Sequence, residues 1–142
     1  VAMTGLFDAI EARFNASPAL RLKGRKLYEG FGDAHVSLTK PFTEVDIKMI
    51  ERLDAFDVDV EKWSVEFRYR AKDVTTAAAE AWVEAITEAY KDANIRSGRF
   101  TACGCRMMSA SSPTLDDGAF NAAANFELII QRARNLPQVR GA

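Results

Sequence analysis

The clearest pattern of hydrophobic and polar positions in this chain runs from Glu61 to Asp92. From 63 to 70, hydrophobic residues alternate with polar ones, and this period of two predicts a strand with one buried face. From 75 or 76 to about 93 the hydrophobic positions follow a helical period, with Asp73 or a threonine as the cap. The inward positions are Trp63, Val65, Phe67 and Tyr69 on the strand, and Ala79, Trp82, Val83, Ile86 and Tyr90 on the helix.

The residues before this pair predict another helix and another strand. Residues 4–16 carry an apolar helical stripe (Leu6, Phe7, Ile10, Phe14), and Pro18 ends that helix. We expect a short strand within 19–25, where Leu20 and Leu22 alternate, an extended 26–28 and a loop over 29–40. Residues 42–52 fit either a strand or a helix. We favour the strand because the strand after it needs a partner, which makes Leu53 to Val60 an acidic hairpin loop.

The residues after the central helix predict two more strands. A turn over 94–99 leads to a strand at 100–108, where Gly104 suggests a bulge. A polar loop from Ser109 to Gly118 precedes a last strand at 119–132, and the tail from about 133 contains Pro137 and Gly141. We therefore predict one α+β domain over residues 1–142, in which an antiparallel β-sheet of about four to five strands packs against two helices.

Composition and charge narrow the classes of function. The 142 residues are 48% hydrophobic and 27% charged, with a net charge of −1. This balance argues against a broad nucleic-acid-binding surface, which needs a basic face. No apolar run approaches the ~20 residues of a membrane span, and the first residues lack the pattern of a secretion signal. We expect no membrane association.

Residues that could carry chemistry are few and scattered. His35 is the only histidine, and Ser37 beside it does not make a catalytic triad. Cys103 and Cys105 are best explained as free thiols on a packed strand, because no base and no further metal ligands accompany them. The acidic positions Asp54, Asp57 and Asp59, and the pair Asp116-Asp117, do not match a calcium loop, and Gly30-Phe31-Gly32 indicates a turn. We expect no catalytic residues, no metal and no cofactor.

Arginines are the more informative polar residues. Arg68 and Arg70 share one face of the predicted strand at 63–70, and Arg106 lies on another strand. If those strands are neighbours, one face of the sheet is solvent-exposed and positively charged. The alternative is a solvated face crossed by salt bridges to Glu44, Asp46 or Glu66, and we favour it slightly.

The order of these elements resembles the tail terminator (tail completion) proteins of long-tailed bacteriophages, from about Leu6 to Arg132. The resemblance rests on an N-terminal helix, then Lys26-Leu27-Tyr28 and a loop leading into Pro41-Phe42. A strand, a variable loop and the strand WSVEFRYRAKD follow. The long helix and a closing pair of strands, split by SASSPTLDDGAF, complete the order.

This resemblance implies a non-enzymatic structural role in the virion. Family members form a ring, usually a hexamer, at the head-proximal end of the tail tube. The implied partners are further copies of the chain, the tail tube protein and a head-completion or connector protein. DNA passes through such a ring without sequence-specific binding, and the chain would be assembled in the host cytoplasm.

Long polar loops between well-patterned elements favour contacts between subunits or rings. We expect these contacts from Leu53, Asp54, Phe56, Asp57, Asp59, Ser111, Ser112, Leu115, Asp116, Asp117, Arg134 and Arg140. Arg68, Arg70 and Arg106 are candidates to face the lumen or a partner.

Two alternatives stay open. One is another neck or head-closure protein of a virion. The other is a small α+β enzyme or ligand-binding domain whose pocket is lined by Trp63, Phe67, Trp82 and Phe126. Convergent polar groups, which ligand sites normally carry, are missing from the second alternative.

Overall fold

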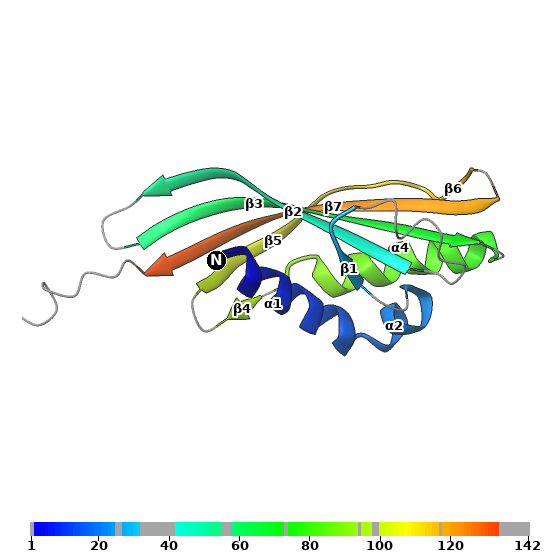
Figure 1. The fold of residues 1–142 in the computed structure, drawn as a ribbon, viewed down its shortest axis with the longest axis horizontal. Helices are drawn as coiled ribbons and strands as arrows, with labels where there is room; N and C mark the ends of the chain where they lie inside the picture. The colour runs from blue at the N-terminus through cyan, green and yellow to red at the C-terminus, as the bar shows by residue number, and fades with distance from the viewer. Residues whose placement is uncertain are drawn as a thin grey trace, which may run out of the picture.

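The computed structural model describes residues 2–24, 27–31, 42–54, 58–72, 74–93, 95–97, 100–116 and 118–133. Within these ranges the helices are α1 (Ala2–Ala16), α2 (Pro18–Gly24) and α4 (Thr76–Tyr90). The strands are β1 (Leu27–Glu29), β2 (Phe42–Asp54), β3 (Val58–Lys72), β4 (Arg96–Ser97), β5 (Phe100–Ala110), β6 (Thr114–Asp116) and β7 (Ala119–Ala133). The helices lie on one face of a long, twisted sheet (Figure 1), so the predicted α+β class is confirmed.

The sheet is built from four long strands and three short ones. Its order is β1-β2-β3-β7-β5-β4, and β6 pairs with β7 beyond the end of β5. The long strands are antiparallel to their neighbours, as predicted. β1 departs from the prediction of an antiparallel sheet, because it runs parallel to β2. Parallel neighbours need a long crossover, and the chain between Glu29 and Phe42 is long enough to supply one.

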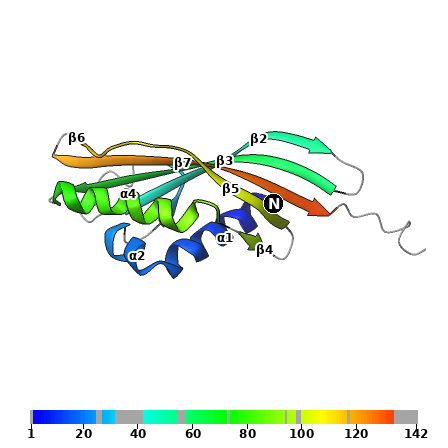
Figure 2. The same cartoon turned by 180° about the vertical axis from the view of Figure 1, so that it is seen from behind.

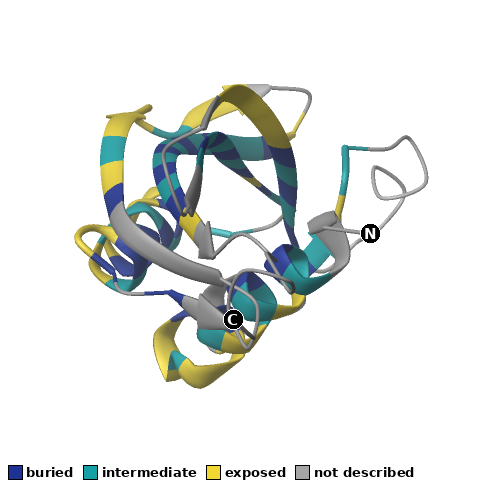
Figure 3. Cartoon of the chain, turned by 90° about the vertical axis from the view of Figure 1, so that its left-hand side faces the viewer, coloured by how far each residue is buried: buried dark blue, intermediate teal, exposed yellow. Residues whose placement is uncertain are grey.

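Alternation along the two central strands separates a buried face from a polar face. The odd-numbered residues of β3 from 61 to 71 and the even-numbered residues of β7 from 122 to 130 are buried. The residues between them are only partly buried or exposed, and the resulting stripes are visible along the curled sheet in Figure 3. The inward positions predicted from 63 to 69 are confirmed.

Helix α4 is attached to the sheet by aromatic contacts. The Trp82 indole stacks on the ring of Tyr69 with centroids 5.1 Å apart, and its Nε1 donates a hydrogen bond of 3.0 Å to Thr43 Oγ1 on β2. Near the other end of α4, the Tyr90 ring packs against Phe67 at 4.7 Å, and its hydroxyl donates to the Ile10 carbonyl of α1. The Trp82 indole nitrogen and the Tyr90 hydroxyl therefore both have hydrogen-bond partners in the core, as burial requires.

The N-terminal helices follow from their local sequence, although only one of them was predicted. Leu6, Ile10 and Phe14 of the predicted stripe of α1 are fully buried, and Phe7 is partly buried against the core. The strand predicted within 19–25 is wrong, because Pro18 opens α2 instead. Proline is well suited to the first position of a helix, and Ser17 caps α2 by accepting a hydrogen bond from the Leu20 amide.

Two predicted loops contain strand instead. β2 continues through Leu53 and Asp54, which pair with Val60 and Asp59 at the start of β3, so the hairpin is longer than expected. This hairpin end of the sheet projects past the helices in both views (Figure 1, Figure 2). The segment from Ser109 to Gly118 is divided in the same way between the end of β5 and the short β6. In both places the alternating pattern is too short to indicate a strand. Strand pairing joins backbone N–H and C=O groups, so it can form there whatever the side chains are.

The ends of the central helix differ slightly from the prediction. Thr75 is its N-cap and accepts a hydrogen bond from the Ala78 amide, as expected of a threonine there. The helix ends at Tyr90, three residues early, because Asp92 adopts a left-handed conformation with φ 57° and its amide bonds to the Cys105 carbonyl. The turn predicted over 94–99 contains β4, which pairs with the start of β5. The predicted bulge at Gly104 is confirmed by a register shift between Ala102 and Gly104.

Replacing Trp82 should test the attachment of α4. We expect Trp82→Ala to lower the free energy of unfolding by about 3–5 kcal/mol, because it leaves a cavity and an unpaired Thr43 hydroxyl. Glu84→Ala on the exposed side of the same helix is the matched control and should stay within about 0.5 kcal/mol of the parent. Urea denaturation followed by circular dichroism measures both, and similar small losses for the two variants would contradict the packing described.

Candidate interaction surface

The face of the sheet away from the helices carries a set of polar side chains, interrupted by Ala123 and Ile129 of β7. Its members alternate with the core positions of β2, β3 and β7, and across the sheet they stand opposite one another. They are Glu44, Asp46, Lys48, Lys62, Ser64, Glu66, Arg68, Arg70, Arg106, Asn121, Asn125 and Glu127. All three described helices lie on the other face, so none of them covers this open face.

Positive and negative charges are interleaved on this open face. Arg68 Nε lies 3.2 Å from Glu66 Oε2, and Arg106 Nη2 lies 3.2 Å from Glu127 Oε1. β7 separates the strand of Arg68 and Arg70 from that of Arg106, so the arginines do not form one basic patch. The solvated face crossed by salt bridges is confirmed, and the basic face is not. Since the arginine side chains of these pairs are more than half exposed, each pair contributes only about 0–1 kcal/mol.

Arg68 and Arg70 line a shallow hollow of about 390 Å³ on this face, together with Glu44, Ser111, Thr114 and Asn121 among others. Arg70 Nη1 donates to Asn121 Oδ1 at 3.1 Å, while Arg70 Nε is buried without a hydrogen-bond partner among the described residues. The Arg68 guanidinium lies over the Phe31 ring, 3.9 Å from its centroid. These groups can donate hydrogen bonds to a carboxylate or phosphate. They include no nucleophile paired with a base.

The predicted contact residues fall into two regions at the ends of the sheet. Leu53, Asp54 and Asp59 belong to the β2–β3 hairpin, and Ser111, Ser112, Leu115 and Asp116 belong to the segment between β5 and β7. The Ser111 side chain already makes a hydrogen bond within the subunit, because its Oγ accepts from the Ala123 amide of β7 just beyond the end of β5. Phe56, Asp57, Asp117, Arg134 and Arg140 lie outside the described residues.

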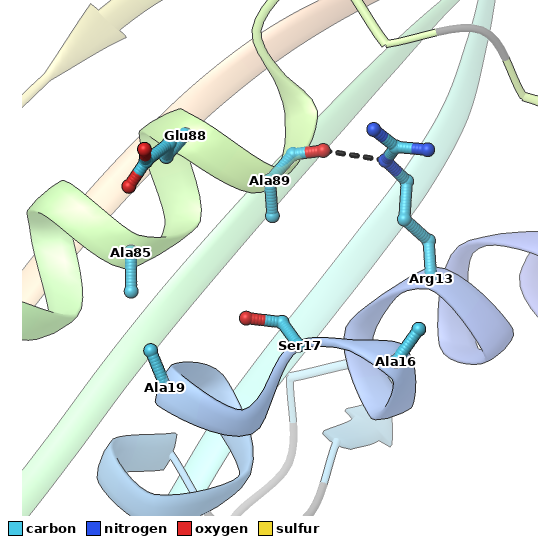
Figure 4. Close-up of a pocket in the computed structure, with 7 residues that line it drawn as sticks. All are labelled: Arg13, Ala16, Ser17, Ala19, Ala85, Glu88 and Ala89. Atoms are coloured by element: carbon cyan, nitrogen blue, oxygen red, sulfur yellow. Dashed lines mark hydrogen bonds between the residues drawn. The ribbon is translucent and has the colours of Figure 1, made fainter.

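A second hollow, of about 320 Å³, lies between α4 and the N-terminal helices (Figure 4). Arg13 reaches across it from α1, and its Nε donates to the Ala89 carbonyl near the end of α4. α4 has no basic residue in its last turn, so Arg13 supplies the positive charge that a helix C-terminus favours. The sequence pattern did not single out Arg13, because one arginine on an amphipathic helix carries no signal of a tertiary contact.

Burial shifts the pKa of three described groups, Tyr69, Tyr90 and Cys105. Burial raises the pKa of the Cys105 thiol to about 12, an effect that the nearby Arg13 charge opposes and the Asp92 charge reinforces. Burial also raises the pKa of Tyr90 and that of Tyr69. Among the described residues, no group of three potential metal ligands occurs, and no helix is long and apolar enough to cross a bilayer. His35 and Ser37 lie outside the described residues.

The aromatic residues considered as a ligand pocket form the core. Trp63, Phe67, Trp82 and Phe126 are at most 2% exposed, and all four belong to the hydrophobic core cluster. Phe67 and Phe126 meet edge to face with ring centroids 5.9 Å apart. Trp63 donates from Nε1 to the buried carboxylate of Glu61 at 2.9 Å. Side chains packed against one another in this way leave no room for a ligand among them.

Comparison with known proteins shows likeness at the level of the fold. No family model matches the sequence, and no curated protein matches it. A chain from the virion of a native gene transfer agent particle has the same fold, with a TM-score of 0.75 and 13% identity. That alignment covers 91% of this chain and 96% of the other. A second solved chain, whose name states no function, aligns with a TM-score of 0.54 and 15% identity over 92% of this chain and 96% of its own.

Alkylation should report the burial of Cys105. In a Cys103→Ser background, we expect a maleimide to modify the folded protein far more slowly than the urea-unfolded chain at pH 8. Raising the thiol pKa from 9.0 to about 12 lowers the thiolate population roughly a thousandfold, and only the thiolate reacts. Mass spectrometry over time measures the rate. Equal rates in the two states would show that Cys105 is open to solvent.

Alkaline conditions should weaken the fold through the same group. Below pH 9 the Cys105 thiol holds its proton in both the folded and the unfolded chain, so its raised pKa has no effect there. Between about pH 9 and about pH 12 only the unfolded chain releases the proton, so the free energy of unfolding falls as pH rises. Cys105→Ala should give a shallower fall than the parent protein in urea titrations across this range. Identical slopes would contradict the assignment.

Proposed function

We propose that this chain is a structural virion protein, and specifically a tail terminator subunit that forms a ring at the head-proximal end of a phage-like tail. The observation that carries the proposal is the fold shared with a chain of the gene transfer agent virion, which extends over nearly the whole of both chains. The element order that resembles tail terminators supports the same role independently. In this role the chain stops tube growth and joins the tail to a head-completion or connector protein.

The open face of the sheet suits a surface past which DNA moves. Affinity for DNA depends on phosphate neutralisation by basic residues, and here Arg68 and Arg106 are already paired with Glu66 and Glu127. A surface of interleaved charges would hold DNA weakly and without reading its sequence. We therefore propose that Arg68, Arg70 and Arg106 face the lumen of the ring. The projecting β2–β3 hairpin and the segment between β5 and β7 would then make contacts between subunits or rings.

Deleting the gene for this chain from its own phage or transfer agent should separate tail termination from other neck functions. We expect tails of variable and excessive length, together with full heads that carry no tail, because nothing would cap the growing tube. Electron microscopy of the lysate measures both, and supplying the chain from a plasmid should restore tails of uniform length.

Two other results would redirect the proposal. Tails of normal length that stay detached from heads would indicate a connector or head-closure protein instead. Normal particles from the deletion, with the chain absent from purified parental virions by mass spectrometry, would refute a structural role.

A further inference from the structure

Large apolar side chains that are exposed to solvent gather on the two opposite edges of the sheet. Among the described residues these side chains are Met49 and Ile50 on β2, Met108 on β5 and Leu115 on β6, and each is 47–65% exposed. β5 and β6 pair with the same side of β7, one after the other, so together they make one interrupted edge. Both edges therefore carry a pair of apolar side chains, although the face between them is polar.

Backbone groups along these edges have few partners within the described chain. Strand β1 pairs only with residues 43–45 of β2, and strand β4 pairs only with the first two residues of β5. One further backbone group of β5, the Cys105 carbonyl, accepts a hydrogen bond from the Asp92 amide. The described residues supply no strand that covers β2 beyond Val45 or the edge from Arg106 to Asp116. Open edges of this kind are hazards for a monomer and are normally blunted by charge or covered.

Irregularities in the two edge strands place apolar residues outward. The β2–β3 register shifts between Met49 and Glu51, and the β5–β7 register shifts between Met107 and Ser109. Each shift leaves one extra residue, Ile50 on β2 and Met108 on β5, and both are more than half exposed. A bulge that only protects an edge would be expected to present a charged residue. Two bulges that present large apolar residues indicate that these edges are covered by protein.

The directions of the strands identify a second copy of the chain as the cover. The four long strands alternate in direction across the sheet, so β2 and β5 at its two edges run opposite to each other. A neighbour in the same orientation therefore brings its β5 edge beside β2 in an antiparallel arrangement, which continues the alternation. Neither open stretch, 46–54 or 106–116, has a net charge above one unit, so repulsion does not oppose the contact.

We propose that successive copies associate edge to edge, with Met49 and Ile50 of one copy packed against Met108 of the next. This contact rests on the ring proposed above and specifies its subunit interface. The stretches 46–54 and 106–116 are offset along the strands. The pairing runs from Met49 through Trp63 and Leu128 to Cys105, so Met49 lies opposite a residue that precedes the second stretch. Neighbouring copies must therefore be staggered along the strands, and closing a sheet into a ring requires such a stagger. The contact is heterologous, so it can close by rotation.

Cysteine cross-linking tests which edges meet. Ile50→Cys and Met108→Cys are combined in a Cys103→Ser background, and purified particles are treated with a short bismaleimide. We expect a ladder of covalent oligomers that ends at the size of the ring. Each single cysteine variant is the control and should give monomers only. Dimers from a single variant would reveal a symmetric contact of one edge with itself, and monomers only from the double variant would overturn the proposal.

Charge substitution at the same positions supplies a second readout. Ile50→Lys and Met108→Asp should each reduce incorporation into particles about tenfold or more, the effect of losing ~1.4 kcal/mol or more at an interface. The combined variant, with opposite charges facing each other, should recover part of the loss. Glu84→Lys on the exposed side of α4 is the control and should assemble normally, and circular dichroism confirms that all variants fold. No recovery in the combined variant would count against direct contact.

These outcomes separate the interface from the role. A covalent ladder formed by the purified chain, in a system where the deletion leaves tails normal, would keep the edge contact and reject tail termination. A deletion with overlong tails, in which the chain of purified particles gives no ladder, would keep tail termination and reject the edge contact.

Discussion

Packing of α4 against the buried face of β3 and β7 is the interaction on which the rest of this structure depends. The stacking of Trp82 on Tyr69 and the contact of Tyr90 with Phe67 attach the helix at two points along its length. The hydrogen bonds of Trp82 to Thr43 and of Tyr90 to Ile10 extend this attachment to β2 and α1. Burial of large aromatic side chains dominates core energetics, and their polar atoms require partners at defined positions.

This one-sided packing determines which surfaces remain for partners. All described helices gather on one face of the sheet, so none of them covers the other face. Among the described strands, β1 and β4 pair with only part of the two outer long strands, β2 and β5. On the open face Arg68 pairs with Glu66 of its own strand and Arg106 pairs with Glu127 of the neighbouring strand, so these positive charges are partly neutralised. The edges differ from it, because among the described residues no further strand pairs with much of β2 and β5, and their large apolar side chains Met49, Ile50 and Met108 are exposed. A subunit of a closed ring needs these two kinds of surface to be distinct.

Sequence reasoning identified most of the fold and a part of the surface. It placed α1, α4, β3 and β7, and it put Arg68 and Arg70 on the polar face, because these segments are long enough for their period to be unambiguous. It misread α2 as a strand and assigned the ends of the β2–β3 hairpin and β6 to loops. In those short segments, the choice between helix, strand and loop depends on contacts with distant residues, such as the packing of Leu20 in the core.

What the sequence determined by itself is therefore the local pattern: which residues of the long segments face inward, and that the long helix begins near Thr75 or Thr76. What the tertiary structure decided is which strands are neighbours. β7 lies between β3 and β5, so the three arginines became members of separate ion pairs and polar contacts instead of one basic patch. Periodicity reports the orientation of each strand toward the core, whereas strand order arises from long-range pairing that no local pattern encodes.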